Sequence, residues 1–353
     1  MHTLKLLLTG AGAPGTRGAL YALHHNPDGI RIRTVGTDLQ ADVLARHWLD
    51  AFFQVPAPEE ASYVEALLAL CERESVDLVI PQTTRELFVF ARHKEAFAAQ
   101  GTPVMVSSLP AIECANHKGE LLQIAQALQF PCPAFVRTRS RRELLDAARQ
   151  LGYPAKPVVV KPPVANGGRG FRVLRAEAWD LARFLAEKPS GEEIPLGALL
   201  AILERGESWP ELLVTEYLPG SEYSVDLFLG ARVQVAVPRL RKAIRSGISF
   251  ANELEYREDL MQYAVALGQR IGLQYAVGFQ FKLDQDGEPK LLECNPRLQG
   301  TMVASLFGGA NVIWLGVKEA LGEVVDWIPP LRPASFERFW GGIGFAGEQV
   351  DEI

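Results

Sequence analysis

Short apolar runs alternate with helical patterns through the first hundred residues. Residues 4–9 and the run IRIRTVGTD, which ends at Asp38, predict two strands, and ALYALHH and SYVEALLALCERES predict the helices that follow them. VDLVIP and TPVMVS predict a third and a fourth strand. Alternation of this kind is typical of a parallel, doubly wound α/β sheet, so we place a Rossmann-like domain at residues 1–110.

The pattern changes after residue 110. Residues 116–130 and the run ELLDAARQLG predict helices, and PVVVKP and FRVLR predict two strands around the glycine-rich turn NGGRG. Helical stretches follow near residues 178–187 and 197–205. LLVTEYL and EYSVDLFLG predict one strand pair, and AVGFQFKLD and KLLECNP predict another across a DGEP turn. This mixed α+β region spans residues 111–330, and the tail at 331–353 shows no clear period.

Composition narrows the class of protein. The chain has 353 residues, of which 48% are hydrophobic and 22% charged, so it has ample material for a buried core. Its formal charge of -6 argues against nucleic acid as a partner, because phosphate binding usually leaves a basic footprint. No apolar run approaches the roughly 18 residues that span a bilayer. The first residues predict a strand instead of a signal peptide, so we expect a cytoplasmic protein. The four cysteines form no CxxC pair, so we expect them to be reduced thiols.

A glycine-rich turn offers a first candidate site. Gly10, Gly12 and Gly15 follow a predicted strand and open a predicted helix, and Asp38 ends the next strand. This is the dinucleotide fingerprint, in which glycines let the backbone approach a pyrophosphate and the acid accepts a ribose hydroxyl. A strand–helix unit also needs a glycine turn when no ligand lies there. The motif alone leaves both interpretations open.

The strongest chemical signal lies in the predicted hairpin near residue 290. Glu293 and Asn295 are two residues apart on one strand and therefore share a face, and Gln280 on the preceding strand can join them. Three oxygen donors on one face suit a hard cation such as magnesium. Arg297 follows directly after the strand. Burying carboxylate and amide side chains on a central strand would cost free energy unless a partner such as this cation were present.

Phosphate-binding groups are predicted before this hairpin. Lys161 ends an apolar strand, and the loop that follows contains Asn166, Gly167, Gly168 and Gly170, whose backbone N–H groups can face phosphate oxygens. Taken alone, Lys161 could simply be an exposed lysine at a sheet edge, and the glycine-rich loop could simply be a flexible turn.

Further charged residues complete the set of candidates. Glu216 and Glu222 lie near strand ends, where a carboxylate can bind an adenine amino group or a ribose hydroxyl. The segment PRLRKAIRSG concentrates positive charge in an acidic protein through Arg239, Arg241, Lys242 and Arg245. Guanidinium groups bind carboxylate and phosphate through two hydrogen bonds, although a solvated basic face is the ordinary alternative.

Taken in order, these segments resemble the ATP-grasp superfamily, in particular the large subunit of carbamoyl-phosphate synthase, over roughly residues 1–310. The motifs that carry the resemblance are Asn116-His117-Lys118, Gly152-Tyr153-Pro154, Val160-Lys161-Pro162, Gly167-Gly168-Arg169-Gly170, Glu216-Tyr217, Gly220-Ser221-Glu222-Tyr223-Ser224-Val225-Asp226, Gln280 and Glu293-Cys294-Asn295-Pro296-Arg297. The resemblance implies an ATP-grasp fold, with the glycine-rich N-terminal unit as a pre-ATP-grasp domain that helps to form the substrate cleft.

The resemblance also implies roles for single residues. Lys118 and Lys161 would contact the ATP phosphates, and the loop with Gly167, Gly168 and Gly170 would close over them. The adenine would lie against Glu216 and the backbone through Tyr217 to Leu218, with Glu222 on the ribose. Gln280, Glu293 and Asn295 would bind magnesium, or manganese in its place. Arg297 would stabilise the transferring phosphoryl group, with Arg239 and Arg241 adding positive charge for the substrate or the γ-phosphate.

The expected activity is that of an ATP- and magnesium-dependent carboxylate–amine ligase, which forms an acyl phosphate that an amine attacks. The chain has one ATP-grasp unit and no glutaminase segment, so we do not expect complete carbamoyl-phosphate synthesis. Residues 186–212 look like an enlarged connection that shapes specificity. The alternatives are a nicotinamide-dependent oxidoreductase that uses the N-terminal glycine turn and a nucleotide-binding module without turnover. The expected partners are small molecules. The sequence leaves the oligomeric state open, and a homodimer is the candidate because it is the commonest assembly.

Overall fold

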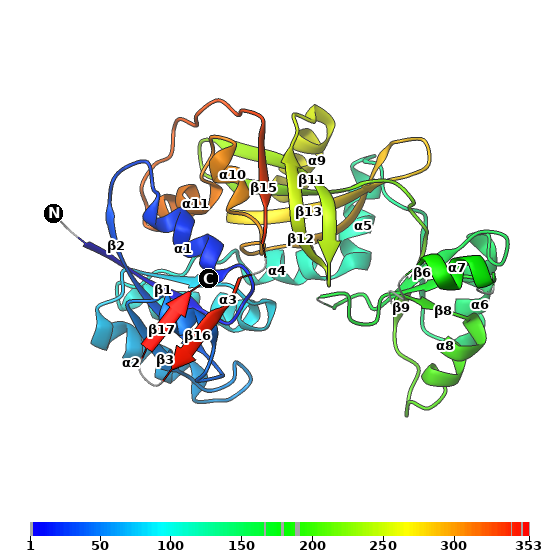
Figure 1. The fold of residues 1–353 in the computed structure, drawn as a ribbon, viewed down its shortest axis with the longest axis horizontal. Coiled ribbons are helices and arrows are strands. Elements are labelled where there is room, and N and C mark those ends of the chain that lie inside the picture. Colours follow the sequence, from blue (N-terminus) through cyan, green and yellow to red (C-terminus); the bar gives the residue numbers. More distant parts are fainter. Residues whose placement is uncertain are drawn as a thin grey trace.

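The computed structural model describes residues 3–165, 167–177, 180–187, 191–339, 341–346 and 349–352. Its first part is a parallel four-stranded sheet in the order β3-β2-β1-β4, drawn in blue in Figure 1. The strands are β1 (Thr3–Thr9), β2 (Arg31–Asp38), β3 (Ala51–Gln54) and β4 (Leu78–Pro81). The helices are α1 (Thr16–His24), the 3-10 helix η1 (Leu44–His47), α2 (Tyr63–Glu74) and α3 (Thr84–Ala99). The prediction of an N-terminal parallel α/β sheet is confirmed.

One predicted strand of this sheet was wrong. The segment TPVMVS makes only a single parallel bridge, between Val79 and Val104, and the fourth strand is β3 instead. Backbone bonds from Val79 N to Pro103 O and from Met105 N to Val79 O tie the segment to the sheet edge. Most of its side chains are buried there. The apolar pattern therefore reflects burial, although the segment does not form the continuous hydrogen bonds of a strand.

The centre of the molecule is a six-stranded antiparallel sheet in the order β14-β13-β10-β11-β12-β15. Its strands are β10 (Glu222–Leu229), β11 (Gln234–Arg245), β12 (Ile248–Leu254), β13 (Tyr275–Leu283), β14 (Pro289–Asn295) and β15 (Ala334–Glu337). The surrounding helices are α4 (Leu109–Asn116), α5 (Lys118–Ala127), α9 (Glu258–Ile271), α10 (Ala304–Phe307) and α11 (Val312–Ala320). One apolar core joins this sheet and α11 to α1 and β1, so the first sheet and the central sheet pack on common residues.

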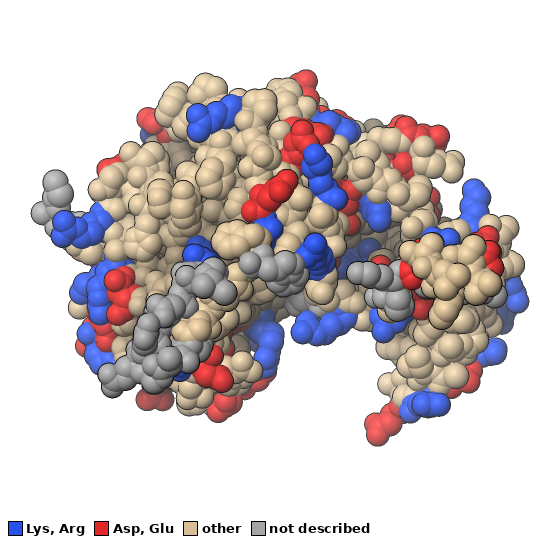
Figure 2. Space-filling view, viewed as in Figure 1, with Lys and Arg blue, Asp and Glu red and all other residues tan. Residues whose placement is uncertain are grey.

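A third sheet forms a lobe that stands apart from the other two (Figure 1). Its strand order is β5-β9-β6-β7-β8, and it has an apolar core of its own. The strands are β5 (Phe135–Thr138), β6 (Val158–Lys161), β7 (Arg172–Leu174), β8 (Glu193–Ile194) and β9 (Leu212–Glu216), and the helices are α6 (Arg141–Gln150), α7 (Leu181–Ala186) and α8 (Leu196–Leu203). Figure 2 shows a hollow between this lobe and the main body, with Lys and Arg side chains at its edges.

The predicted pairing of LLVTEYL with EYSVDLFLG was wrong. β9 lies in the lobe between β5 and β6, whereas β10 lies in the central sheet between β11 and β13. The turn between them is packed against β13, where Gly220 N donates to Leu283 O and a Cβ on Gly220 would lie 2.7 Å from Leu283 Cβ. Both strands are buried almost throughout, and a continuous apolar run does not reveal its partner strand. The segment 217–221 therefore connects the lobe to the body.

The tail contributes structure that has no clear period in sequence. β15 pairs antiparallel with β12 and extends the central sheet, and β16 (Ile343–Ala346) pairs with β17 (Gln349–Glu352). Among the helices of the described residues, none combines the length and apolar character needed to cross a membrane. The four cysteines are all described and all free, which agrees with the expectation of reduced thiols.

Candidate active site

Two lysine ammonium groups approach one carboxylate between the lobe and the central sheet. Lys118 begins α5, Lys161 ends β6, and Glu293 lies near the end of β14. Lys118 Nζ lies 3.3 Å from Glu293 Oε2 and donates to the carbonyl of Ala165 at 2.8 Å. The charges of Lys118 and Glu293 both act on Lys161. Residues that are far apart in sequence, and that were predicted to bind phosphate and metal, therefore lie together.

Lys161 is a buried cation that is only 7% exposed. Burial is the main cause that lowers the pKa of Lys161 to about 8, and the nearby charge of Lys118 lowers it further. The charges of Glu293 and Glu222 oppose this shift without cancelling it. Within the described residues, no hydrogen bond contributes to the pKa of Lys161. An anionic ligand in the cleft would supply the missing compensation.

The three predicted metal ligands share one place on the β13–β14 hairpin. Gln280 lies directly opposite Glu293, and Asn295 follows two residues later on the same face of β14. Asn295 Nδ2 lies 3.4 Å from Glu293 Oε1. The described residues contain no cluster of three His, Cys, Asp or Glu side chains that could hold a metal. One carboxylate with two amide oxygens instead fits a hard divalent ion that keeps water and phosphate as its other ligands.

Arg297 lies where the first sheet meets the hairpin. Its Nε donates to Thr84 Oγ1 at 3.1 Å, at the start of α3, and its NH1 donates to the carbonyl of Leu298 at 2.8 Å. Burial lowers the pKa of Arg297, and the charge of Glu293 opposes that shift. The guanidinium is therefore held near the predicted metal carboxylate without a direct ion pair among the described residues.

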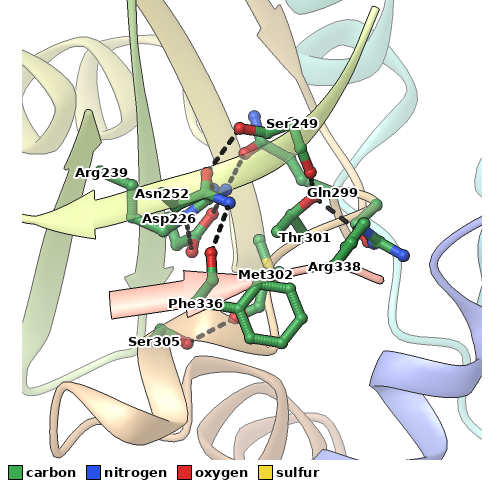
Figure 3. A network of polar contacts seen from close by, with 11 residues as sticks. Asp226, Arg239, Ser249, Asn252, Gln299, Thr301, Met302, Ser305, Phe336 and Arg338 are labelled. Atoms are coloured by element: carbon green, nitrogen blue, oxygen red, sulfur yellow. Dashed lines mark hydrogen bonds and ion pairs between the residues drawn. The ribbon is translucent and has the colours of Figure 1, made fainter. Parts of the chain in front are cut away.

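Arg239 lies at the centre of a buried polar network that sequence did not reveal (Figure 3). Its Nε and NH2 donate to the two oxygens of Asp226 at 2.7 and 2.8 Å, and its NH1 donates to Asn252 Oδ1 at 2.7 Å. Arg239 is 1% exposed and Asp226 is fully buried. NH2 also donates to Gln299 Oε1 at 3.3 Å, two residues after Arg297. The charge of Arg239 is thus taken up by Asp226, and its contacts reach the loop behind the candidate site.

The tail supplies a second arginine to this network, and sequence analysis missed it. Arg338 follows β15, donates to the carbonyl of Gly300 and lies 3.5 Å from Thr301 Oγ1. Burial lowers the pKa of Arg338, and the charge of Arg239 lowers it further. Its Nε and the Nε2 of Gln299 have no hydrogen-bond partner among the described residues. Glu222 and Asp226 lie on the same face of one strand, so the sequence could have indicated Asp226 as a second acidic residue there. No sequence pattern singled out Arg338.

Two other predicted residues contact each other. Arg241 of β11 forms an ion pair with Glu222 at the start of β10, and its NH2 donates to the carbonyl of Gly247 at 2.6 Å. Glu222 also acts on Lys161, so this pair borders the cleft. Lys242 lies on the opposite strand face, is exposed and pairs with Glu253.

The residues predicted for adenine form the connection between lobe and body. Glu216 ends β9, and its Oε1 accepts a hydrogen bond from Ala134 N at 3.2 Å. The ring of Tyr217 lies 5.3 Å from the guanidinium carbon of Arg175, and Leu218 is buried. A polar side chain beside an aromatic ring and a buried apolar residue offers the polar and apolar contacts that line small-molecule sites.

The glycine-rich loop after β6 has the backbone that its sequence predicted. Gly167, Gly168 and Gly170 have φ angles of +62°, +71° and +74°, a region that side chains disfavour. Successive residues of this kind can direct N–H groups toward an anion. Asn166, which we predicted as part of this loop, lies outside the described residues.

The N-terminal glycine turn is occupied by protein contacts. The Cβ positions of Gly10 and Gly15 would meet the side chain of Thr83 and, at 2.9 Å, the Cα of Gly300. The carboxylate of Asp38 accepts hydrogen bonds from the turn at Gly12 N, at 2.8 Å, and from Gln40 N, at 3.0 Å. The helix start that a pyrophosphate would need is therefore covered by the loop near Gly300. Gly10 allows close packing within the N-terminal part and Gly15 allows close packing of the two halves, so the dinucleotide interpretation is not favoured.

Two segments of the chain match models of known protein families. Residues 6–105 match the model of the PylC-like N-terminal domain, and residues 208–338 match a family described as ATP-grasp in the biosynthetic pathway with Ter operon. The arginine-specific large chain of carbamoyl phosphate synthase from Geobacillus stearothermophilus is 23% identical over 74% of this chain. A carbamoyl phosphate synthase large chain from Clostridium perfringens is 23% identical over 85% of it. The chain spans about a quarter of the length of these relatives, since the matches cover 24% and 26% of them.

Solved structures share the fold. N5-carboxyaminoimidazole synthetase from Staphylococcus aureus, in complex with ADP, superposes with a TM-score of 0.69 at 14% identity and covers 95% of this chain and 82% of its own. The biotin carboxylase domain of 2-oxoglutarate carboxylase from Hydrogenobacter thermophilus, with MgADP and bicarbonate, has a TM-score of 0.69 at 15% identity over 100% of this chain and 84% of its own. The predicted ATP-grasp fold is confirmed, because residues 208–338 match an ATP-grasp family and the chain has the fold of these structures over 95% or more of its length.

Proposed function

We propose that this chain is an ATP- and magnesium-dependent ligase that activates a carboxylate as an acyl phosphate, which an amine then attacks. One observation carries the proposal. Lys118 and Lys161 approach Glu293 from two different elements, and Gln280 lies opposite Glu293 on the neighbouring strand. Two cations beside an oxygen-donor set form the minimal site for a nucleotide triphosphate with its metal.

The nucleotide would lie between the lobe and the central sheet. Lys118 and Lys161 would bind its phosphates, and the N–H groups of Gly167, Gly168 and Gly170 would cover them from the lobe. The connection from Glu216 through Tyr217 to Leu218 would hold the adenine, and Glu222 would accept hydrogen bonds from the ribose. The buried, poorly compensated ammonium of Lys161 supports this assignment, since bound phosphate would restore its electrostatic balance. Structural relatives bind ADP and MgADP.

Gln280, Glu293 and Asn295 would hold the magnesium ion. The ion would neutralise phosphate charge and orient the γ-phosphate. Lys118 lies 3.3 Å from Glu293, so the carboxylate faces positive charge from the protein as well. Two amide ligands and one carboxylate leave the site with low net charge, which suits an ion that arrives together with a polyanion.

The arginines divide into one that would touch the reacting groups and two that would position them. Arg297 has no carboxylate partner among the described residues and lies beside Glu293, so it would stabilise charge on the transferring phosphoryl group. Arg239 is held by Asp226 and Arg241 by Glu222. Because both charges are compensated, we assign Arg239 to orienting the loop at Gln299 and Arg241 to orienting Glu222.

The reaction divides into two balanced steps. The carboxylate oxygen attacks the γ-phosphorus, the bond to the bridging oxygen breaks, and ADP leaves. An amine then attacks the acyl carbon, a C–N bond forms, and inorganic phosphate leaves with the carboxylate oxygen. Phosphoryl transfer needs positioning and charge neutralisation more than covalent help from protein. The partners would be small carboxylates and amines, in a homodimer.

An ADP-release screen tests the proposal. The chain is incubated with ATP, magnesium and a panel of amino acids and small acids, and hydroxylamine traps any acyl phosphate as a hydroxamate. We expect ADP and hydroxamate together with at least one acid, and neither product with Lys161→Ala. Lys156→Ala, at an exposed lysine on the same lobe, serves as the matched control. ADP release that persists at the parental rate in Lys161→Ala would contradict the site assignment.

A further inference from the structure

His117 is the single residue between two helices. α4 ends at Asn116 and α5 begins at Lys118. The backbone N–H of His117 donates into the last turn of α4 at 3.2 Å. The carbonyl of His117 accepts the backbone N–H of Leu121 at 3.0 Å and so begins α5. The position of α5 relative to α4 therefore depends on this one residue.

The imidazole of His117 caps α5. Glu120 N donates to His117 Nδ1 at 3.2 Å, so the ring satisfies one of the backbone N–H groups that a helix leaves unpaired in its first turn. Ser, Thr, Asp and Asn usually supply this acceptor through a side-chain oxygen. A histidine can supply it only while Nδ1 keeps its lone pair, because a protonated imidazole is a donor at both nitrogens. Positive charge is also unfavourable at a helix N-terminus. The cap is therefore present when His117 is neutral and absent when it is charged.

The chain makes room for this ring at residue 119. A Cβ on Gly119 would lie 3.2 Å from Cε1 of His117, 3.3 Å from Cδ2 of Leu213 and 3.4 Å from Cδ of Arg137. Glycine is unfavourable in a helix, and these close contacts account for its presence in the first turn of α5. The imidazole, β5 and β9 thus meet at Gly119. His117 is half-buried, so its ring can still exchange a proton with solvent.

The turn that His117 caps carries Lys118. The backbone N–H of Lys118 donates to the carbonyl of Pro163 at 2.8 Å, and its Nζ donates to the carbonyl of Ala165 at 2.8 Å. The same Nζ lies 3.3 Å from Glu293 Oε2. Both ends of this lysine are thus held by the segment that leads from β6 to the glycine-rich loop. Fraying of the first turn would release the backbone that directs the ammonium into the cleft, whereas the later turns of α5 remain buried in an apolar core.

We infer that His117 is a positioning residue for Lys118, and through it for the ATP phosphates: the neutral imidazole holds the first turn of α5, and protonation of the imidazole releases it. The inference rests on the proposed function, in which Lys118 binds phosphate. Nucleotide affinity should therefore decrease as the pH falls through the range in which histidine gains its charge, about pH 8 to 5.

Other ionisable groups lie on the elements that meet at His117, and they are common to all variants of this residue. They are Glu113 and Cys114 on α4, Lys118 and Glu120 on α5, Arg137 on β5, Glu211 and Glu216 at the two ends of β9, and Lys161 on β6. Arg137 pairs with Glu211 at 2.7 Å, and a hydrogen bond from Arg139 is the main cause that lowers the pKa of Glu211, so this pair persists in mild acid. Lys161, with a pKa of about 8, gains charge over the same range. That gain would strengthen phosphate binding, so its effect has the opposite sign to the loss of the cap.

Substitutions that imitate one ring nitrogen at a time test the inference. Oδ1 of asparagine takes the place of Nδ1 and accepts a hydrogen bond without titrating, whereas the amide of glutamine takes the place of Nε2, one bond further from the backbone. Calorimetry measures the affinity of the full chain for MgATP. His117→Gln should bind MgATP about fivefold more weakly than the parent at pH 7.5, as expected for the loss of a cap, and His117→Asn should restore the affinity. At saturating ATP, kcat for ADP release should differ by less than about twofold, because bound phosphate returns Lys118 to its place. His93→Gln, at an exposed histidine of α3, is the matched control and should bind as the parent does.

The pH dependence supplies a readout that a merely structural role would not give. Between pH 7.5 and pH 5.5 the Kd of the parent for MgATP should rise about fivefold relative to that of His117→Asn, because only the parent loses its cap. Ionisation of ATP and of Lys161 cancels in this comparison, which also does not require the glutamine variant to fold. In the ligand-free chain, NMR should show the backbone amide of Glu120 shifting with pH in the parent and not in His117→Asn.

Three results would overturn the inference: an asparagine variant as sensitive to pH as the parent, a glutamine variant that binds as tightly as the parent, or a Glu120 amide that does not respond to pH. The test is separate from that of the activity. MgATP binding that depends on His117 as expected, without ADP release in the acid screen, would uphold the inference and refute the ligase. ADP and hydroxamate formation with equal MgATP affinity in all three proteins would uphold the ligase and refute the role of His117.

Discussion

Replacing Lys161 by methionine should make the protein more stable and abolish its ATP-dependent activity. Methionine keeps the unbranched stem as far as Cε but removes the ammonium group of a residue that is 7% exposed and whose pKa burial lowers to about 8. A buried charge without full compensation opposes folding. The same charge would attract the ATP phosphates, so one substitution separates the contribution to folding from the contribution to function.

The magnitude follows from the shift in pKa. A decrease from 10.5 to about 8 corresponds to an unfavourable contribution of roughly 3 kcal/mol while the lysine is charged in both states. Between these two pH values the unfolded chain keeps a proton on Lys161 that the folded chain has lost. The free energy of unfolding of the parent protein therefore rises with pH in this window. The advantage of Lys161→Met should be full below pH 8 and vanish above pH 10.5.

Urea unfolding of the ligand-free protein, followed by tryptophan fluorescence, to which Trp209 contributes from the lobe, measures this difference at pH 7 and at pH 10.5. Lys156→Met is the matched control, because Lys156 is exposed on the same lobe, and it should change the free energy of unfolding by less than about 0.5 kcal/mol. ADP release by Lys161→Met should fall at least ~100-fold. A Lys161→Met protein that is less stable than the parent at pH 7, or a difference that does not shrink with pH, would refute the reasoning.

Three further substitutions test other parts of the structure. Glu293→Gln should lower kcat for ADP release at least ~100-fold, because the only carboxylate of the magnesium set is lost; turnover at the parental rate in a magnesium titration would exclude this residue as a ligand. Asp226→Asn should decrease the free energy of unfolding by about 3–5 kcal/mol, since Arg239 would remain buried without its ion-pair partner; urea denaturation that matches the parent would show that the pair is not buried. Gly15→Val should lower the melting temperature, because its Cβ would lie 2.9 Å from the Cα of Gly300 and overpacking costs about 1–3 kcal/mol; an unchanged thermal melt would mean that the two loops do not touch.

Local sequence determined most of the elements and the hairpin that carries the metal set. Short apolar runs bounded by turn residues located β1, β2, β6, β13 and β14, because the burial of a strand is visible in its own residues even where its partner strand is not. The spacing of Glu293 and Asn295 fixed their common face, and a short turn fixed Gln280 opposite them. The limits of the domains and the roles of the site residues remain predictions.

Tertiary structure alone decided which groups meet across the chain. The sequence could not say that β9 and β10 belong to different sheets, since a strand buried on both faces carries no mark of its partner. It indicated Arg239 as a positive charge for the substrate or the γ-phosphate, with a solvated basic face as the alternative, whereas the structure buries Arg239 against Asp226 and Asn252.

The same limit applies to the approach of Lys118 and Lys161 to Glu293 and to the arrival of Arg338 from the tail. Such contacts depend on how sheets pack, and packing joins residues whose separation in sequence carries no information about their distance in space. Sequence therefore specified the chemistry that each segment can offer, and the packing of the three sheets decided which of those groups face one another.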